Sequence, residues 1–190
     1  MVTNETRRTL LKAALLGAAS PLMPFGCASL NKQSINEPSL IGCSIIGKGK
    51  YSAVVANAEG KPIHTLPVPE RGHGVAINSQ LGQAVVFARR PGSYFMAFDY
   101  MSGNVVKLMP AGKNRHFYGH GVFSNDGAWL YATEGHSRTS EGVIGVFDVH
   151  NNYQKVDEFT GFGLGPHEVI IMPDGRLVIG VGGVHTDGRT

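Results

Sequence analysis

Short runs of alternating apolar and polar residues, separated by turn-forming residues, continue along the chain from residue 40 onward. The clearest group lies between residues 119 and 160. Here residues 120–123, 129–133, 143–149 and 154–159 are rich in β-branched and aromatic side chains, as half-buried strands are. Asn-Asp-Gly and His-Asn-Asn segments between them have the composition of tight turns. The group is predicted to be one four-stranded antiparallel unit.

The same unit recurs along the chain. His73, His120 and His167 follow one another at intervals of 47 residues, and Asp174-Gly175 repeats the turn of Asp126-Gly127. A period of 40 to 50 residues with four strands is typical of a β-propeller blade. We therefore predict an all-β fold, a β-propeller with four-stranded blades of about 47 residues. The other predicted strands are residues 40–46, 52–57, 63–68, 75–78, 84–87, 94–99, 105–109, 168–172 and 177–181.

The number of predicted strands is small for a closed propeller. Residues 40–190 hold about three to three and a half blades, and the first of these lacks its first strand. Closed propellers have about four to eight blades. We expect this chain to be truncated, the N-terminal part of a larger propeller whose first blade is completed by a strand from the other end.

The first residues resemble an export signal. Thr6-Arg-Arg-Thr-Leu-Leu-Lys12 matches the twin-arginine pattern, and the apolar run over 13–25 is too short and too often interrupted to cross a membrane. We predict a twin-arginine signal peptide over residues 1–28, a polar tether over 29–39 and the partial propeller over 40–190, with export to the periplasm. Cys27 follows a small residue, so two outcomes stay open: a lipid anchor on Cys27, or cleavage nearby without one.

The charge distribution excludes one class of partner. The net charge is +3, of which the first 30 residues supply +2, and all eight histidines lie in the nearly neutral remainder. No basic stripe interleaved with aromatic residues is present, so we expect no nucleic-acid partner. We expect membrane contact only through a lipid anchor.

The repeated histidines are the main candidates for chemistry. Propeller topology places them where the innermost strands begin, at the rim of the central channel, and neutral imidazoles that converge suit Zn, Cu, Fe, Ni or haem iron. We predict a transition-metal or haem site on His73, His120 and His167, with Glu168, His116 or His185 nearby. A structural role, with each imidazole hydrogen-bonded between strands, is the alternative.

A second set of candidates lies in the loops predicted at the same rim. Arg89, Arg90 and Arg115 are suited to bind a carboxylate or phosphate in bidentate fashion, unless they form ion pairs with Glu134 or Glu70. The same predicted ligand-binding rim includes His116, Tyr118, Glu134 and Glu168. No nucleophile–base motif is present, and no catalytic residue is assigned.

Linked motifs carry a resemblance to a known family. They are Arg71-Gly-His-Gly, Phe87-Ala-Arg-Arg-Pro-Gly92, Arg115-His-Phe-Tyr-Gly-His-Gly-Val-Phe-Ser124, Ala132-Thr-Glu134, Gly142-Val-Ile-Gly-Val146 and Gly165-Pro-His-Glu168. With these, residues 40–190 resemble the N-terminal half of the bacterial family called domain of unknown function 1513. The resemblance implies an exported, seven-bladed propeller that acts near iron uptake. It implies partners such as an imelysin-like lipoprotein and a di-haem oxidoreductase-like protein.

Three functions are consistent with these features. The first is a periplasmic binding or scaffold component associated with iron uptake, whose histidine- and arginine-rich rim holds a metal, haem or partner. The second is a metal-dependent propeller enzyme, a lactonase-like hydrolase or an oxidoreductase. The third is a purely structural interaction module. A fold alone does not decide among them.

Overall fold

The computed structural model describes residues 37–186, which form thirteen β-strands. The predicted signal peptide over residues 1–28, with Cys27, and most of the predicted tether over 29–39 lie outside the described residues. Within the described range, no helix is long and apolar enough to span a membrane.

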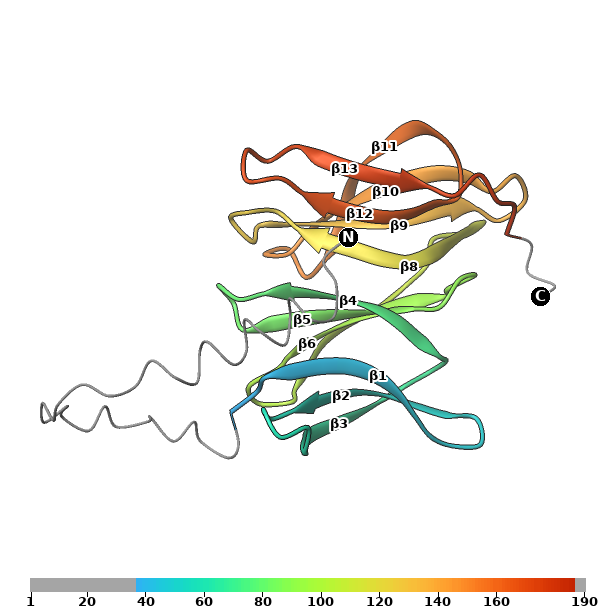
Figure 1. Cartoon of the computed structure of the whole chain (residues 1–190). Helices are drawn as coiled ribbons and strands as arrows, with labels where there is room; N and C mark the ends of the chain where they lie inside the picture. The colour runs from blue at the N-terminus through green and yellow to red at the C-terminus, as the bar shows by residue number, and fades with distance from the viewer. Residues whose placement is uncertain (1–36, 187–190) are drawn as a thin grey trace, which may run out of the picture. The chain divides into compact units, whose positions relative to one another are not determined.

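The strands form four sheets in chain order, and in each sheet every strand pairs antiparallel with its neighbour in the sequence (Figure 1). The all-β prediction and the two four-stranded units are therefore confirmed. The first sheet holds β1 (Leu40–Gly47), β2 (Lys50–Ala56) and β3 (Pro62–Val68). The second holds β4 (Gly72–Asn78), β5 (Gln83–Ala88), β6 (Tyr94–Asp99) and β7 (Val105–Pro110). The third holds β8 (Arg115–Phe123), β9 (Trp129–His136), β10 (Glu141–Asp148) and β11 (Gln154–Leu164), and the fourth holds β12 (Pro166–Ile171) and β13 (Leu177–Val181).

The sheets pack on one another in a propeller-like order. The first strands of the last three sheets lie side by side, β4 against β8 and β8 against β12. Strand β1 packs against β4 in the way that the second strands β5 and β9 pack against β8 and β12. It therefore takes the position of a second strand, in agreement with the prediction that the first unit lacks its first strand.

The second sheet is buried on both faces, which explains the unbroken apolar run over residues 84–88 of β5. One face packs on the first sheet and the other on the third. On the third-sheet side, the ring of Phe95 lies 5.4 Å from that of Phe117 and 5.1 Å from that of Phe147, both nearly edge to face. Aromatic rings prefer this geometry, and each buried ring stabilises the fold by about 1.5–3 kcal/mol. The cluster therefore holds β6 of the second sheet against β8 and β10 of the third.

A repeated hydrogen bond connects neighbouring sheets at the end opposite the histidines. The side-chain amide of Asn78 donates to the carbonyl of Gly127 at 2.9 Å. The amide of Asn125, 47 residues later, donates to the carbonyls of Met172 and Pro173 at 3.1 Å. Each asparagine thus holds the turn of the next sheet.

The start of β8 differs from its prediction. Residues 114–118 were expected to be a rim loop, but β8 begins at Arg115, and β9 continues through Glu134 to His136. The prediction of a loop is wrong because Phe117, Tyr118 and Glu134 are buried, and Phe117 pairs with Glu134 in the ladder of β8 and β9. Three candidate rim residues, Arg115, His116 and Tyr118, are consequently strand residues.

Candidate metal centre

Three neighbouring first strands bring the repeated histidines together. His73 comes from β4, His120 from β8 and His167 from β12, and one nitrogen of each lies within 4.8 Å of the other two. The ring centroids of His73 and His120 are 4.8 Å apart, and those of His120 and His167 are 4.6 Å apart. The convergence predicted from the repeat is present in the structure.

A break in the strand ladder accompanies each histidine. The register shifts between Gly72 and Val75 in β4, between Phe117 and Gly121 in β8, and between Pro166 and Glu168 in β12. Such irregularities twist a strand and redirect its side chains. A register shift next to each histidine therefore accompanies the turning of all three imidazoles toward one point.

Two glycines permit the close approach of β4 and β8 at this point. A Cβ atom on Gly74 would collide with the carbonyl oxygen of Gly119 and lie 3.3 Å from Nδ1 of His120. Gly119 has a φ of +101°, and a Cβ there would lie 2.9 Å from Cδ2 of His73. The Gly-His-Gly sequences are thus explained by the packing of two histidine-bearing strands.

His120 is oriented by a carboxylate. Its Nδ1 lies 3.0 Å from Oε2 of Glu168, while its Nε2 is buried and has no hydrogen-bond partner among the described residues. The contact with the carboxylate places the proton on Nδ1 and leaves a lone pair on Nε2. Burial lowers the pKa of His120, against the opposing effect of Glu168, and the other two histidines lower it further.

His73 is the exposed member of the group. Its pKa is lowered, first by burial of part of the ring and then by the charges of His167, Arg89, Arg71 and Arg90. The rings of His73 and His167 form no hydrogen bond with any described residue. Among the described residues, the rings of His73 and His167 are therefore not hydrogen-bonded between strands, whereas the ring of His120 on β8 contacts Glu168 on β12.

Two of the predicted arginines lie beside this cluster. Arg89 and Arg90, in the loop between β5 and β6, line a cavity with Val184, His185 and Thr186, which follow β13. His185 thus faces these arginines and is not a member of the three-nitrogen cluster. Segments far apart in the sequence meet at one face, as the propeller topology predicted.

Arg71 joins them, although the sequence reasoning did not assign it to the site. Its carbonyl accepts a hydrogen bond from the backbone N–H of Arg89 at 2.8 Å, and its side chain lines a second cavity with His73. The signal for it was weak, because the positions equivalent to Arg71 in the two later repeats are Tyr118 and Gly165.

The family model described as Protein of unknown function (DUF1513) matches residues 66–190. This chain belongs to the DUF1513 family. A search of curated proteins gives no match. Among solved structures, the DUF1513 chain is similar to "Dihydro-heme d1 dehydrogenase NirN in complex with DHE", with a TM-score of 0.47 and 15% identity, over 59% of this chain and 23% of that one. The chain therefore spans under a quarter of that structure's length.

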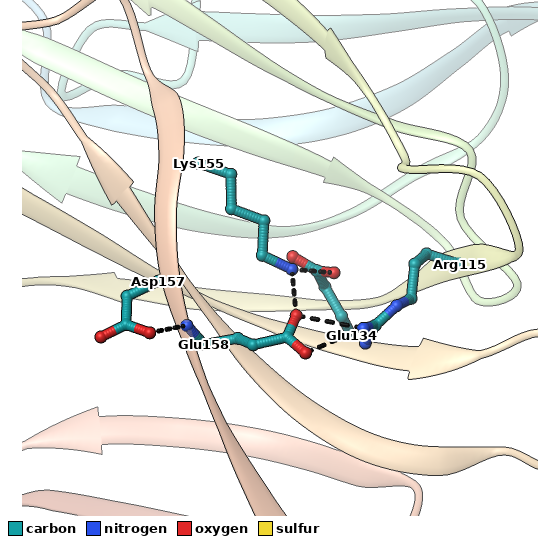
Figure 2. Close-up of polar contacts among 5 residues, drawn as sticks. All are labelled: Arg115, Glu134, Lys155, Asp157 and Glu158. Carbon is teal, nitrogen blue, oxygen red and sulfur yellow. Dashed lines mark hydrogen bonds and ion pairs between the residues drawn. The ribbon is translucent and has the colours of Figure 1, made fainter.

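Arg115 and Glu134 of the DUF1513 chain belong to a separate cluster of charges (Figure 2). Arg115 donates to both oxygens of Glu158 at 2.9 and 3.1 Å, and Lys155 lies 2.9 Å from Glu134 and 2.8 Å from Glu158. Glu134 is only 3% exposed, and burial raises its pKa against the attraction of Lys155. Since Lys155 and Glu158 lie on the outermost strand β11, this cluster ties the third sheet together and does not join the histidines on the innermost strands.

His116 and Tyr118 are also internal. The hydroxyl of Tyr118 donates to the carbonyl of Ser140 at 3.1 Å, and the ring of His116 packs edge-on against it with centroids 4.7 Å apart. Burial lowers the pKa of His116 and raises that of Tyr118. Of the predicted site residues, the structure groups His73, His120, His167 and Glu168, with Arg89, Arg90 and His185 beside them.

Proposed function

We propose that this DUF1513 protein binds one transition-metal ion through His73, His120 and His167. The observation that carries the proposal is the lone pair on Nε2 of His120, which is buried within a group of three imidazoles and lacks a hydrogen-bond partner among the described residues. Leaving such a group unpaired costs about 1–3 kcal/mol. A metal ion bound by the three nitrogens would satisfy it.

Each residue has a distinct part in this site. The three imidazoles bind the ion, and Glu168 holds the ring of His120 through Nδ1, the arrangement commonly seen behind metal-ligating histidines. The ion would supply Lewis acidity or redox chemistry, according to its identity. Three converging nitrogens favour a single ion over haem, since haem iron leaves only its axial positions to protein ligands.

The purely structural alternative receives less support. It requires all three imidazoles to be hydrogen-bonded between strands. His120 has such a contact through Glu168, but the rings of His73 and His167 form no hydrogen bond with the residues that the structure describes. Ring packing alone would not select histidine at three successive positions. A metal-binding role accounts for the residue type as well as for the geometry.

The cellular role that we propose is a periplasmic binding or scaffold component associated with iron uptake. Its support is the twin-arginine pattern at the N-terminus and the family resemblance, which also suggests an imelysin-like lipoprotein and a di-haem oxidoreductase-like protein as partners. We propose that the complete fold is a seven-bladed propeller, in which a further strand pairs with β1. A lipid anchor on Cys27 would place the protein at the membrane surface.

A metal-dependent enzyme is the second candidate, and one observation favours it. His73 is exposed, and a site with three protein ligands leaves a coordination position for a substrate, as catalytic zinc sites do. Hydrolysis of lactones, or oxidation of an added reductant coupled to reduction of an added electron acceptor, by the metal-loaded protein would establish this function. Stoichiometric metal without turnover would favour the binding role.

Metal binding by the whole chain tests the proposal. Titration with Co²⁺ and Zn²⁺ against a competing chelator is expected to show one site. Separate replacement of His73, His120 and His167 by Ala should each weaken binding by more than about 100-fold, since even loss of a residue behind a ligand costs 10- to 100-fold. His150→Ala, which changes an exposed turn histidine, is the matched control. Equal affinity in all four variants, with circular dichroism unchanged, would refute the site.

A further inference from the structure

Three arginines without a counter-charge lie on the His73 side of the cluster. Arg71, Arg89 and Arg90 are all exposed, and none forms an ion pair or a side-chain hydrogen bond with a described residue. The neighbouring carboxylate of Glu70 accepts hydrogen bonds from the backbone N–H and the hydroxyl of Ser93 instead. Guanidinium groups of this kind are available to a ligand.

The backbone fixes these arginines close to the histidines. Arg71 is two residues before His73 and lines one cavity with it, and the Arg89 N–H bonds to the Arg71 carbonyl at 2.8 Å. The carbonyl of Ala88, next to Arg89, lies 3.2 Å from the Cβ position of Gly119, which also faces His73. These contacts bring the backbone segments of all three arginines beside His73.

The charges around the site do not balance once a metal is bound. Arg71, Arg89 and Arg90 carry three positive charges, and Glu168 and Glu70 carry two negative ones. Three neutral imidazoles add nothing, so a divalent or trivalent ion would leave a strongly positive group at an exposed surface. Glu168 lies on the His120 side, which leaves the excess on the side of His73.

We infer that the three-histidine site takes its metal together with an oxyanion, whose carboxylate or phosphate oxygens are bound by Arg71, Arg89 and Arg90. The inference rests on the proposed function and adds the class of ligand to it. Planar guanidinium groups bind such oxygens in bidentate fashion, and the cavity that Arg89 and Arg90 share with His185 and Thr186 gives the anion a place to lie. Three protein ligands also leave the ion a position for one anion oxygen.

The test compares anion binding by the metal-free and the Co²⁺-loaded whole chain. Inorganic phosphate and acetate are titrated separately, with the visible spectrum of Co²⁺ and calorimetry as readouts, so that the two kinds of oxyanion are distinguished. We expect at least one of them to bind about 5- to 150-fold more tightly to the Co²⁺-loaded protein. By linkage, that anion raises the Co²⁺ affinity by the same factor.

Variants separate the anion subsite from the metal ligands. Arg89→Ala/Arg90→Ala and Arg71→Ala should abolish the anion effect and leave the Co²⁺ affinity without anion within about threefold. Arg176→Ala is the control, because this exposed arginine pairs with Asp174 in a distant turn and with no other residue in the described range. Equal anion affinity with and without Co²⁺, or an unchanged effect in the arginine variants, overturns this inference and leaves the metal site standing. Absence of Co²⁺ binding overturns both.

Discussion

The closeness of β4 and β8 at the histidines leads to a sharp prediction for Gly74→Ala. Gly74 has an ordinary negative φ, so alanine meets no backbone strain there. Its Cβ, however, would lie closer than 3.0 Å to the carbonyl oxygen of Gly119, a separation that Cβ atoms essentially never show, and 3.3 Å from Nδ1 of His120. A backbone oxygen cannot rotate away, so the two strands must separate.

Such overpacking typically costs about 1–3 kcal/mol. For a chain of this size, that loss lowers the melting temperature by about 2–12 °C, because 1 kcal/mol corresponds to roughly 2–4 °C. The separation should also weaken Co²⁺ binding, since His73 and His120 move apart. Thermal unfolding followed by circular dichroism, together with Co²⁺ titration, measures both effects.

Gly42→Ala is the matched control for this experiment. Gly42 also lies in a strand, but a Cβ there meets nothing within 4 Å. We expect Gly42→Ala to leave Co²⁺ binding unchanged and to be neutral or stabilising by up to about 1 kcal/mol, because alanine loses less conformational freedom than glycine. If Gly74→Ala were as stable as Gly42→Ala and bound Co²⁺ like the wild type, the account of the strand contact would be refuted.

Three further predictions concern the site and its support. Glu168→Gln should weaken Co²⁺ binding by about 10- to 100-fold, because Glu168 acts on the metal through His120. Its side chain is 52% exposed, so the stability should change little. Unchanged Co²⁺ affinity in a chelator competition would contradict this prediction. The pKa of Glu134 is raised above its ordinary 4.5, so the contribution of its carboxyl to folding stability falls as the pH rises above 4.5. Urea unfolding should therefore show Glu134→Gln gaining stability relative to the wild type between about pH 4.5 and pH 7. A difference in unfolding free energy that stays constant over this interval would argue against the reasoning. Tyr153→Phe should lower the free energy of unfolding by about 0.5–1.5 kcal/mol, because the Tyr153 hydroxyl donates to Gln83 at 2.6 Å and joins the second and third sheets. Tyr100→Phe removes a hydroxyl without such a bond in the described structure, so it should cost less in the same unfolding assay. Equal losses in the two variants would count against the reasoning.

Most of the fold could be predicted from periodicity in the sequence. The interval of 47 residues between His73, His120 and His167 defines the sheets and brings the three rings together, because equivalent positions on neighbouring first strands must be adjacent. Asp99 and Asp148, at the ends of the equivalent strands β6 and β10, also have the same role, since each carboxylate accepts two backbone N–H groups of the turn that follows.

Side chains that depend on their partners could not be assigned in the same way. The sequence places Arg115 and Glu134 near the rim, but only the strand order β11–β10–β9–β8 shows that they meet Lys155 and Glu158 across the third sheet. The bonds of Asn78 and Asn125 to the next turn were likewise missed, although these asparagines are 47 residues apart. Asparagine is so common in turns that its spacing alone does not indicate a link between sheets.

Zn K-edge X-ray absorption of the Zn²⁺-loaded whole chain tests the central claim most directly. The account predicts three imidazole ligands at about 2.0–2.1 Å, reduced to two in His120→Ala. A first shell made of oxygen ligands, or one with at most a single imidazole, would contradict the three-histidine site.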